Sequence, residues 1–247
     1  MKTALISVTF RKKTIEEVAA LAKQAGLEAI EWGGDVHVPP MDTDAISRAL
    51  AACKENGLEI SAYGSYYRCV EGVDFAPVLE TAIQLGTPII RVWAGRKGSD
   101  EATEEDRAVV VKLLKEAVAM AAEKGCIVAT EYHPNTLTDD IDSAERLFAE
   151  VPGLYTYWQP NHNRTVEQCL DDIRRLGNLV QNVHVFQRDE NNLRVPLEWG
   201  KDRWAAYLPA VAAHTQSRFV GLEFMPRDSE EQLMIDAALL HDLMKGI

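Results

Sequence analysis

Four side chains that can bind a metal ion close successive apolar stretches in the second half of this 247-residue sequence. They are Glu131, Gln159, His184 and Glu223. A buried strand that ends on a polar side chain directs that side chain toward a site or toward solvent. Two carboxylates, one imidazole and one amide oxygen suit a hard or borderline divalent cation. We therefore expect one divalent metal ion at these residues, with Mn, Mg, Co and Zn left open.

The elements that must position these groups follow a repeated pattern of helix, glycine, short link and apolar strand. A glycine just past a helix end adopts the left-handed conformation that stops the helix. Five such units, each about 30 residues long, predict a parallel sheet with helical crossovers. The glycines are Gly26, Gly57, Gly86, Gly125 and Gly177.

Eight apolar segments are predicted to be strands, and the chain is close to the ~250 residues typical of a (β/α)8 barrel. No linker rich in Pro and Ser and no charge block divides the sequence, so we expect one domain over residues 1–247. The predicted fold is therefore α/β, a single (β/α)8 barrel. The predicted strands are residues 3–9, 27–32, 58–63, 88–93, 126–131, 154–159, 180–186 and 219–223.

The barrel fold would bring the four metal-binding side chains together. Active sites of such barrels lie at the carboxyl ends of the strands, and these residues would end strands five to eight, which are neighbours. The alternative is that each is an ordinary strand-end residue that faces solvent. A carboxylate on a metal ion can still act as an acid or a base. Glu131 and Glu223 are therefore the predicted pair that removes and returns a proton.

Further polar and aromatic residues follow the same strand ends. Arg188 could hold a substrate hydroxyl or carboxylate, and its alternative is a surface ion pair with Asp189 or Glu190. A histidine in a loop is usually a surface residue or a hydrogen-bonded cap, and aromatic rings at a barrel rim often serve packing. Aromatic rings beside hydroxyl-binding groups also suit a sugar. The predicted substrate contacts are His162, Arg188, His133, Trp93 and Glu31.

Charge and composition limit the classes of partner. The chain has 26 Lys and Arg against 38 Asp and Glu, which gives a formal net charge of −12. This charge repels phosphate backbones and anionic membranes, so we expect no nucleic acid and no membrane as partner. The sequence shows neither a signal peptide nor an apolar run of ~18 residues. Its 4 separated cysteines predict reduced thiols in a cytoplasmic protein. A homo-oligomer is left open.

Several short motifs resemble the xylose isomerase-like TIM barrel superfamily of sugar isomerases and epimerases, which also includes AP endonucleases. The resemblance covers nearly the whole chain. The endonuclease activity fits poorly, because the chain is acidic. The motifs are Arg91–Gly95, Glu131-x-His133, Leu137-Thr138, Asn182–Val185, Leu197–Gly200 and Gly221–Glu223.

The resemblance implies that Glu131, His184 and Glu223 are metal ligands and that the two glutamates are the acid/base pair. It also implies substrate contacts for His162 and Arg188. Gln159 departs from the family pattern, which usually has an aspartate there. An amide oxygen can bind a metal ion but carries no charge. The ligands then contribute two negative charges instead of three, which should weaken metal binding and strengthen the ion as an electrophile.

Together these inferences predict a divalent-metal-dependent isomerase or epimerase that acts on a ketose, an aldose or a related polyol through an enediolate. The predicted partner is a small sugar or polyol substrate. Two alternatives remain. One is an inosose-type dehydratase, a lyase that needs the same first proton transfer, and the other is a metal-binding barrel without catalysis.

Overall fold

Alternating strands and helices build the closed barrel that the sequence predicts. The computed structural model describes residues 1–161 and 163–247, and within them eight parallel strands form one ring. The strands are β1 (Lys2–Ile6), β2 (Ala29–Gly33), β3 (Glu59–Gly64), β4 (Ile89–Val92), β5 (Ile127–Glu131), β6 (Tyr155–Trp158), β7 (Val180–Val185) and β10 (Phe219–Leu222). Strand β10 pairs with both β7 and β1, which closes the ring.

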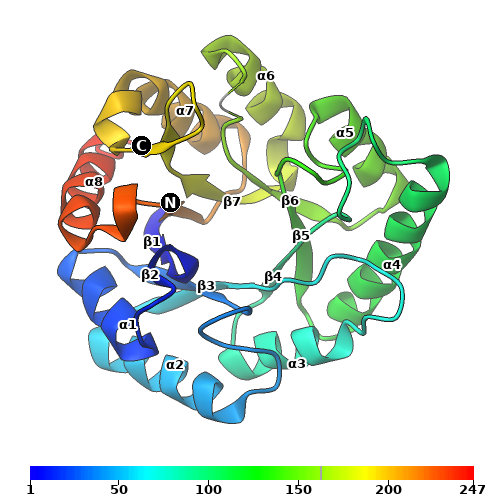
Figure 1. The fold of residues 1–247 in the computed structure, drawn as a ribbon, viewed down its shortest axis with the longest axis horizontal. Coiled ribbons are helices and arrows are strands. Elements are labelled where there is room, and N and C mark those ends of the chain that lie inside the picture. Colours follow the sequence, from blue (N-terminus) through cyan, green and yellow to red (C-terminus); the bar gives the residue numbers. More distant parts are fainter. Residues whose placement is uncertain (162) are drawn as a thin grey trace.

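Helices cover the outside of the ring of strands (Figure 1). Those in the described residues are α1 (Ile15–Gln24), α2 (Thr43–Asn56), α3 (Ala76–Leu85), α4 (Glu104–Glu123), α5 (Ile141–Glu150), α6 (Val166–Leu176), α7 (Lys201–His214) and α8 (Glu230–Leu243). The part of the chain that is described contains no helix long and apolar enough to cross a membrane.

Local sequence explains where several helices begin and end. Thr14 forms a capping box that opens α1, and Thr103 does the same for α4. Gly57 ends α2 in the left-handed conformation, at φ 67° and ψ 35°. Gly177 is different, because its φ of 50° and ψ of −132° lie outside that region. The predicted left-handed stop is therefore wrong for α6.

The interior of the barrel changes character along the strands. Nearer the amino ends it is filled by small and apolar side chains, as is usual for such barrels. These are Ala4, Ala29, Phe219, Ala62, Ile89, Ala129 and Tyr157. Two residues further along β2, β4 and β5, the inward side chains become Glu31, Arg91 and Glu131, all buried. The carboxyl end of the barrel therefore holds a charged layer above an apolar one.

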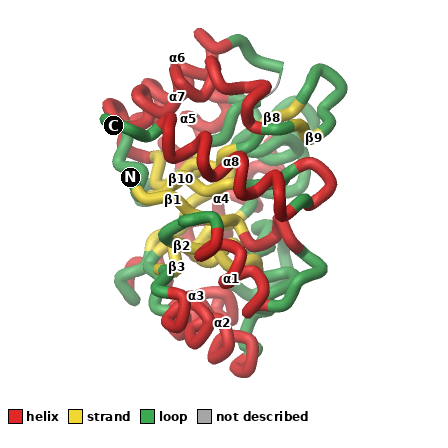
Figure 2. Tube along the Cα trace, turned by 90° about the vertical axis from the view of Figure 1, so that its left-hand side faces the viewer, coloured by secondary structure: helices red, strands yellow, loops and turns green. Residues whose placement is uncertain are grey.

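Two segments differ from the predicted elements. The first predicted strand runs to residue 9, but β1 ends at Ile6 and Ser7–Phe10 form a 3-10 turn. The stretch predicted as a long irregular loop, Arg188–Trp204, includes all but the first residue of a short hairpin of β8 (Gln187–Arg188) and β9 (Arg194–Val195). Figure 2 shows this hairpin at the end of the barrel away from the N-terminus. It brings Arg188 to the barrel mouth.

Candidate metal centre

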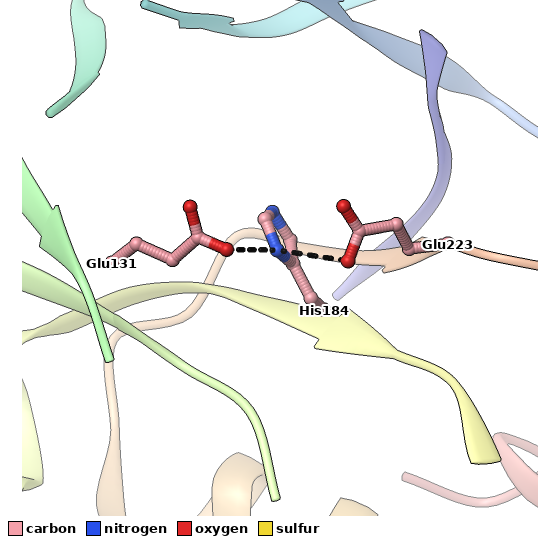
Figure 3. A group of neighbouring side chains, drawn as sticks. All are labelled: Glu131, His184 and Glu223. Atoms are coloured by element: carbon pink, nitrogen blue, oxygen red, sulfur yellow. Dashed lines mark ion pairs between the residues drawn. The ribbon is translucent and has the colours of Figure 1, made fainter. Parts of the chain in front are cut away.

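Three of the predicted metal ligands converge inside the barrel mouth. Glu131 is the last residue of β5, His184 lies within β7, and Glu223 directly follows β10. Figure 3 shows His184 between the two carboxylates. Its Nδ1 lies 3.6 Å from Glu131 Oε1 and 3.6 Å from Glu223 Oε2. One ligand atom from each residue lies within 4.8 Å of the others, and all three residues are buried.

The fourth predicted ligand, Gln159, lies beside this cluster in the strand register. Trp158 at the end of β6 pairs with Val183, so the next residue, Gln159, is adjacent to His184. Its side chain is buried, and its Oε1 has no hydrogen-bond partner among residues 1–161 and 163–247. The structure is compatible with a metal-binding oxygen at Gln159, and its role as a ligand stays a prediction.

Two further buried charges lie next to the cluster. Arg91 on β4 places its Nη1 2.9 Å from Glu131 Oε2 and its Nε 3.5 Å from Glu31 Oε1. The second carboxylate oxygen of Glu31 lies 3.5 Å from His184 Nε2. Glu31, which the sequence suggests as a substrate contact, therefore contacts the back of the metal-binding cluster. The cavity described below is lined by other residues.

The surroundings make the two glutamates chemically different. Burial raises the pKa of Glu131, but the Arg91 guanidinium and His184 outweigh burial and bring that pKa well below its usual range. Burial raises the pKa of Glu223 to about 7, because the charge of His184 offsets only part of its effect. Carboxyl groups whose pKa values are pushed apart in this way are suited to different proton-transfer roles.

His184 is held in a strongly negative environment. Burial lowers its pKa, but Glu223, Glu31 and Glu131 outweigh burial and raise that pKa to about 10. A divalent ion would act in the opposite direction, because a bound cation favours the neutral, metal-binding imidazole.

The donor atoms fit a divalent cation. Among the described residues, the buried atoms in this region without a hydrogen-bond partner include Gln159 Oε1, His184 Nδ1 and Glu223 Oε2, besides atoms of Glu31, Arg91 and Asn182. Leaving buried polar atoms unpaired is costly, so such a group calls for a ligand or an ion. One imidazole nitrogen with carboxylate and amide oxygens is a donor set used for Mn, Zn and Mg. The residues therefore fit a bound metal ion, whose identity this set leaves open.

A cavity of about 250 Å³ opens beside the cluster. Tyr132 and Phe224 line it, each one residue past a glutamate of the cluster, and so do Gln159, His133 and Arg188. The cavity therefore adjoins the metal-binding side chains and is large enough for a small substrate.

Arg188 presents a cation to this cavity. Within the described residues it forms no ion pair with Asp189 or Glu190, the alternative that the sequence leaves open. Its Nη1 donates to the Asn192 carbonyl at 3.0 Å, and its guanidinium lies 5.5 Å from the ring centres of Phe186 and Phe224. Burial, together with the neighbouring Arg194 charge, lowers the pKa of Arg188. An anionic group of a substrate would compensate this half-buried charge.

The other predicted substrate contacts lie in different places. The rings of Trp93 and His133 are 4.4 Å apart, and the guanidinium of Arg68 covers Trp93 at 3.8 Å. His133 lines the cavity, Trp93 is not among its lining residues, and the predicted substrate contact of Trp93 stays a prediction. His162 is outside the described residues, so its predicted contact stays untested.

The sequence reading missed two buried groups near the cluster. Arg91 lies in the otherwise apolar strand β4, and an arginine in a buried strand could have indicated a buried charge that needs a partner. Asn182 donates to the Tyr157 hydroxyl at 3.0 Å, below His184 on the same strand. Side chains alternate along a strand, so Asn182, two residues before His184 on β7, could have been predicted to point to the same side.

Replacing Gln159 with aspartate is expected to tighten binding of the divalent ion by about 1 kcal/mol or more. The substitution adds one negative charge beside the cation, and solvent and side-chain rearrangement reduce the gain. Titration calorimetry with metal-free wild type and variant measures the change. Unchanged or weaker binding in the variant would show that Gln159 is not a ligand or that its neutrality is compensated nearby.

Comparison with known proteins agrees with this geometry. Residues 19–243 match the family described as Xylose isomerase-like TIM barrel. A 3-dehydroshikimate dehydratase of Bacillus anthracis is 30% identical over 162 residues, which cover 61% of this chain and 58% of that protein. This alignment thus spans little more than half the length of the relative.

Solved structures share the fold over the whole chain. The probable 3-DHS dehydratase AsbF of Bacillus anthracis has a TM-score of 0.84 at 23% identity, covering 98% of this chain and 99% of that one. The IOLI protein with a bound zinc atom has a TM-score of 0.78 at 15% identity, covering 99% and 98%. The 3-keto-D-glucoside 4-epimerase YcjR of E. coli has a TM-score of 0.75 at 20% identity, covering 99% of both chains.

Proposed function

Because the chain belongs to the xylose isomerase-like TIM barrel family, we propose that it is a divalent-metal-dependent enzyme that removes a proton next to a carbonyl group. The observation that carries this proposal is the buried cluster of Glu131, His184 and Glu223 beside an open cavity. A divalent ion held there supplies positive charge to the oxygens of the substrate, which makes the neighbouring C–H bond more acidic.

The side chains of the cluster supply the proton transfer. Glu131 and Glu223 approach His184 from two sides, so a substrate carbon between them can lose a proton to one and receive a proton from the other (Figure 3). The place of Glu223 on the other side of His184 from Glu131 suits it to accept or return that proton. Arg91 holds Glu131 as a carboxylate, the form that can bind the ion and accept a proton.

For the reaction itself we favour dehydration of a small cyclic hydroxyketone that carries a carboxylate, of the 3-dehydroshikimate kind. The curated relative and AsbF both support this choice. Arg188 supports it independently, because a half-buried cation at the cavity suits a carboxylate better than a neutral sugar. The base takes the proton next to the ketone, the hydroxyl on the following carbon leaves with a proton as water, and a carbon–carbon double bond forms.

A sugar isomerase or epimerase is the second candidate. The two carboxylates on either side of His184 favour it, because an epimerase must remove a proton from one face of a carbon and return it to the other. The similarity to the 3-keto-D-glucoside 4-epimerase agrees with this possibility. Both candidates share the first proton transfer and differ in the fate of the neighbouring hydroxyl.

One experiment distinguishes them. Metal-loaded protein is incubated in heavy water with 3-dehydroshikimate and, separately, with a panel of ketoses, aldoses and inososes. Dehydration appears as new ultraviolet absorbance and loss of one water from the product mass. Epimerisation or isomerisation appears in NMR spectra as an isomer with unchanged composition, in which deuterium at the reacting carbon reports exchange with solvent. If the protein binds the metal but converts none of these substrates, the result favours a metal-binding barrel without catalysis.

Replacing Arg188 with alanine is expected to raise KM for a carboxylated substrate by about 10- to 100-fold, because a charged hydrogen bond contributes about 1.5–3 kcal/mol. The kcat should change much less, since Arg188 is not part of the Glu131–His184–Glu223 cluster that would carry the proton transfer. Steady-state kinetics measure both constants.

Arg194→Ala is the matched control. Arg194 is a neighbouring arginine that already pairs with Asp228 at 2.8 Å. Equal effects of the two variants, or an Arg188→Ala variant with wild-type KM, would contradict a carboxylate contact at Arg188.

A further inference from the structure

We propose that Glu31 and Arg91 are positioning residues for the metal site, with Glu31 fixing the imidazole of His184 and Arg91 fixing the carboxylate of Glu131. This inference rests on the proposed function, because it assumes that the cluster binds a divalent ion.

Glu31 acts on the side of His184 that faces away from the other ligands. Its Oε2 lies 3.5 Å from His184 Nε2, at the long end of hydrogen-bond distance, while Nδ1 faces Glu131 and Glu223. A carboxylate at Nε2 favours the tautomer that carries its proton there. The lone pair then lies on Nδ1, toward the cluster. Histidine ligands are commonly oriented by such an outer carboxylate.

Arg91 contacts only one of the two carboxylate oxygens of Glu131 and leaves the other free for the metal site. Its Nη1 contacts Oε2 at 2.9 Å, which leaves Oε1 directed at His184 Nδ1. Its Nε also lies 3.5 Å from Glu31 Oε1, so one guanidinium connects the carboxylates that flank His184. Arg91 and Glu31 are almost fully buried, at 2% and 1% exposure, so neither can turn to solvent. The pair is therefore a fixed support and not a surface contact.

Gly64 on β3 leaves the space that this pair occupies. A methyl group at Gly64 would lie 2.6 Å from Glu31 Oε1 and 2.9 Å from Arg91 Nη2, closer than real Cβ atoms approach their neighbours. The register agrees, because Gly64 pairs with Arg91 across β3 and β4 and with Gly33 across β2 and β3. The ion pair therefore fits in the barrel because residue 64 is a glycine.

Charge also connects the pair to the site. Arg91 lies between Glu31 and Glu131 and offsets one of the three carboxylate charges of Glu31, Glu131 and Glu223, which leaves two charges to match a divalent cation. The alternative is that the ion pair only fills the barrel interior. Apolar side chains do that two residues lower along the strands, at Ala29, Ile89 and Ala129. Because a buried ion pair contributes little net stability compared with apolar packing, a positioning role explains the pair better.

The test measures metal binding and the ligand field at the ion, so it does not depend on turnover. Glu31→Ala removes the contact to His184 Nε2, and Glu31→Gln keeps its shape without the charge. Gly64→Ala displaces the pair while every charged group remains. Ile89→Val is the matched control, since it disturbs the apolar layer below and keeps both charged side chains of the pair. Titration calorimetry with Mn²⁺, the absorption spectrum of the Co²⁺-loaded protein and the Tm of the metal-free protein are recorded for each.

We expect Glu31→Ala and Gly64→Ala to weaken Mn²⁺ binding by about 10- to 100-fold, the usual effect of removing an outer partner of a metal ligand. The Co²⁺ spectrum should change in both, and Glu31→Gln should show a smaller effect. Ile89→Val should lower the Tm only. If Glu31→Gln and Gly64→Ala keep wild-type metal affinity and spectrum, the positioning role is wrong. If the wild type binds no metal at the cluster, the proposed function fails as well, so the two failures are distinguishable.

Discussion

Replacing Glu223 with glutamine is expected to lower kcat by about 100- to 10,000-fold, the usual contribution of a positioned acid or base. The amide keeps an oxygen beside His184 but cannot accept a proton from carbon. Glu223 contacts His184 at 3.6 Å, and its pKa is raised to about 7. Because burial already disfavours the charged form of Glu223, the neutral amide should not unfold the protein. Metal binding should weaken through the loss of one charge. Kinetics with the substrate that the wild type converts, at saturating metal, measure the effect.

Two further variants complete this test. Glu131→Gln should lower kcat as well, and it should also destabilise the protein by about 3–5 kcal/mol, because Arg91 then loses its closest carboxylate inside the barrel. Glu198→Gln, in the 3-10 helix Leu197–Gly200 before α7, changes a glutamate that faces solvent beside Lys201 and should leave kcat unchanged. A Glu223→Gln variant with wild-type kcat and bound metal would show that Glu223 carries no proton.

Removing the divalent ion is expected to abolish turnover and to lower the Tm by about 5–11 °C relative to protein at a metal concentration of 100 Kd. Ligand binding at that concentration stabilises the folded state by about 2.7 kcal/mol, and each kcal/mol moves the Tm of a domain of this size by about 2–4 °C. The physical cause is the close group of Glu131, His184 and Glu223, whose carboxylates a cation stabilises. Thermal unfolding with and without a chelator measures the shift.

A His184→Gln variant provides the control for this prediction. Without the imidazole, the chelator should have little effect on the Tm, because the remaining oxygens bind the ion weakly. An equal shift in wild type and variant would locate the stabilising ion elsewhere in the protein. No shift in the wild type would contradict a bound divalent ion.

The sequence predicted the fold and the centre of the site because both depend on local patterns. Apolar strands that end at Glu131 and Glu223 show their boundaries directly, and the repeated helix–strand unit determines the parallel arrangement. A parallel barrel then places all carboxyl ends at one mouth. The convergence of Glu131, His184 and Glu223 therefore follows from the strand order, and the structure confirms it.

The support of the site could not be predicted in the same way. Glu31 on β2 and Arg91 on β4 are separated by 60 positions in the sequence, and their contact depends on barrel closure and on the space at Gly64. A strand pattern shows that Glu31 points inward or outward, but not which residue of another strand it meets. The position of Arg188 depends on the β8–β9 hairpin, and the Asp and Asn residues of its turn indicate a turn but not where the hairpin lies relative to the barrel.

The metal centre can be located in a crystal of the protein soaked with Mn²⁺, with anomalous diffraction recorded near the manganese edge. We expect one strong anomalous peak at the barrel mouth, bound by Glu131, Gln159, His184 and Glu223 at about 2.0–2.4 Å. If the ion is bound by Glu131, His184 and Glu223 alone, the site is correct and only Gln159 is not a ligand. A peak elsewhere, or no peak at a metal concentration that supports turnover, would show that these residues do not form the metal centre.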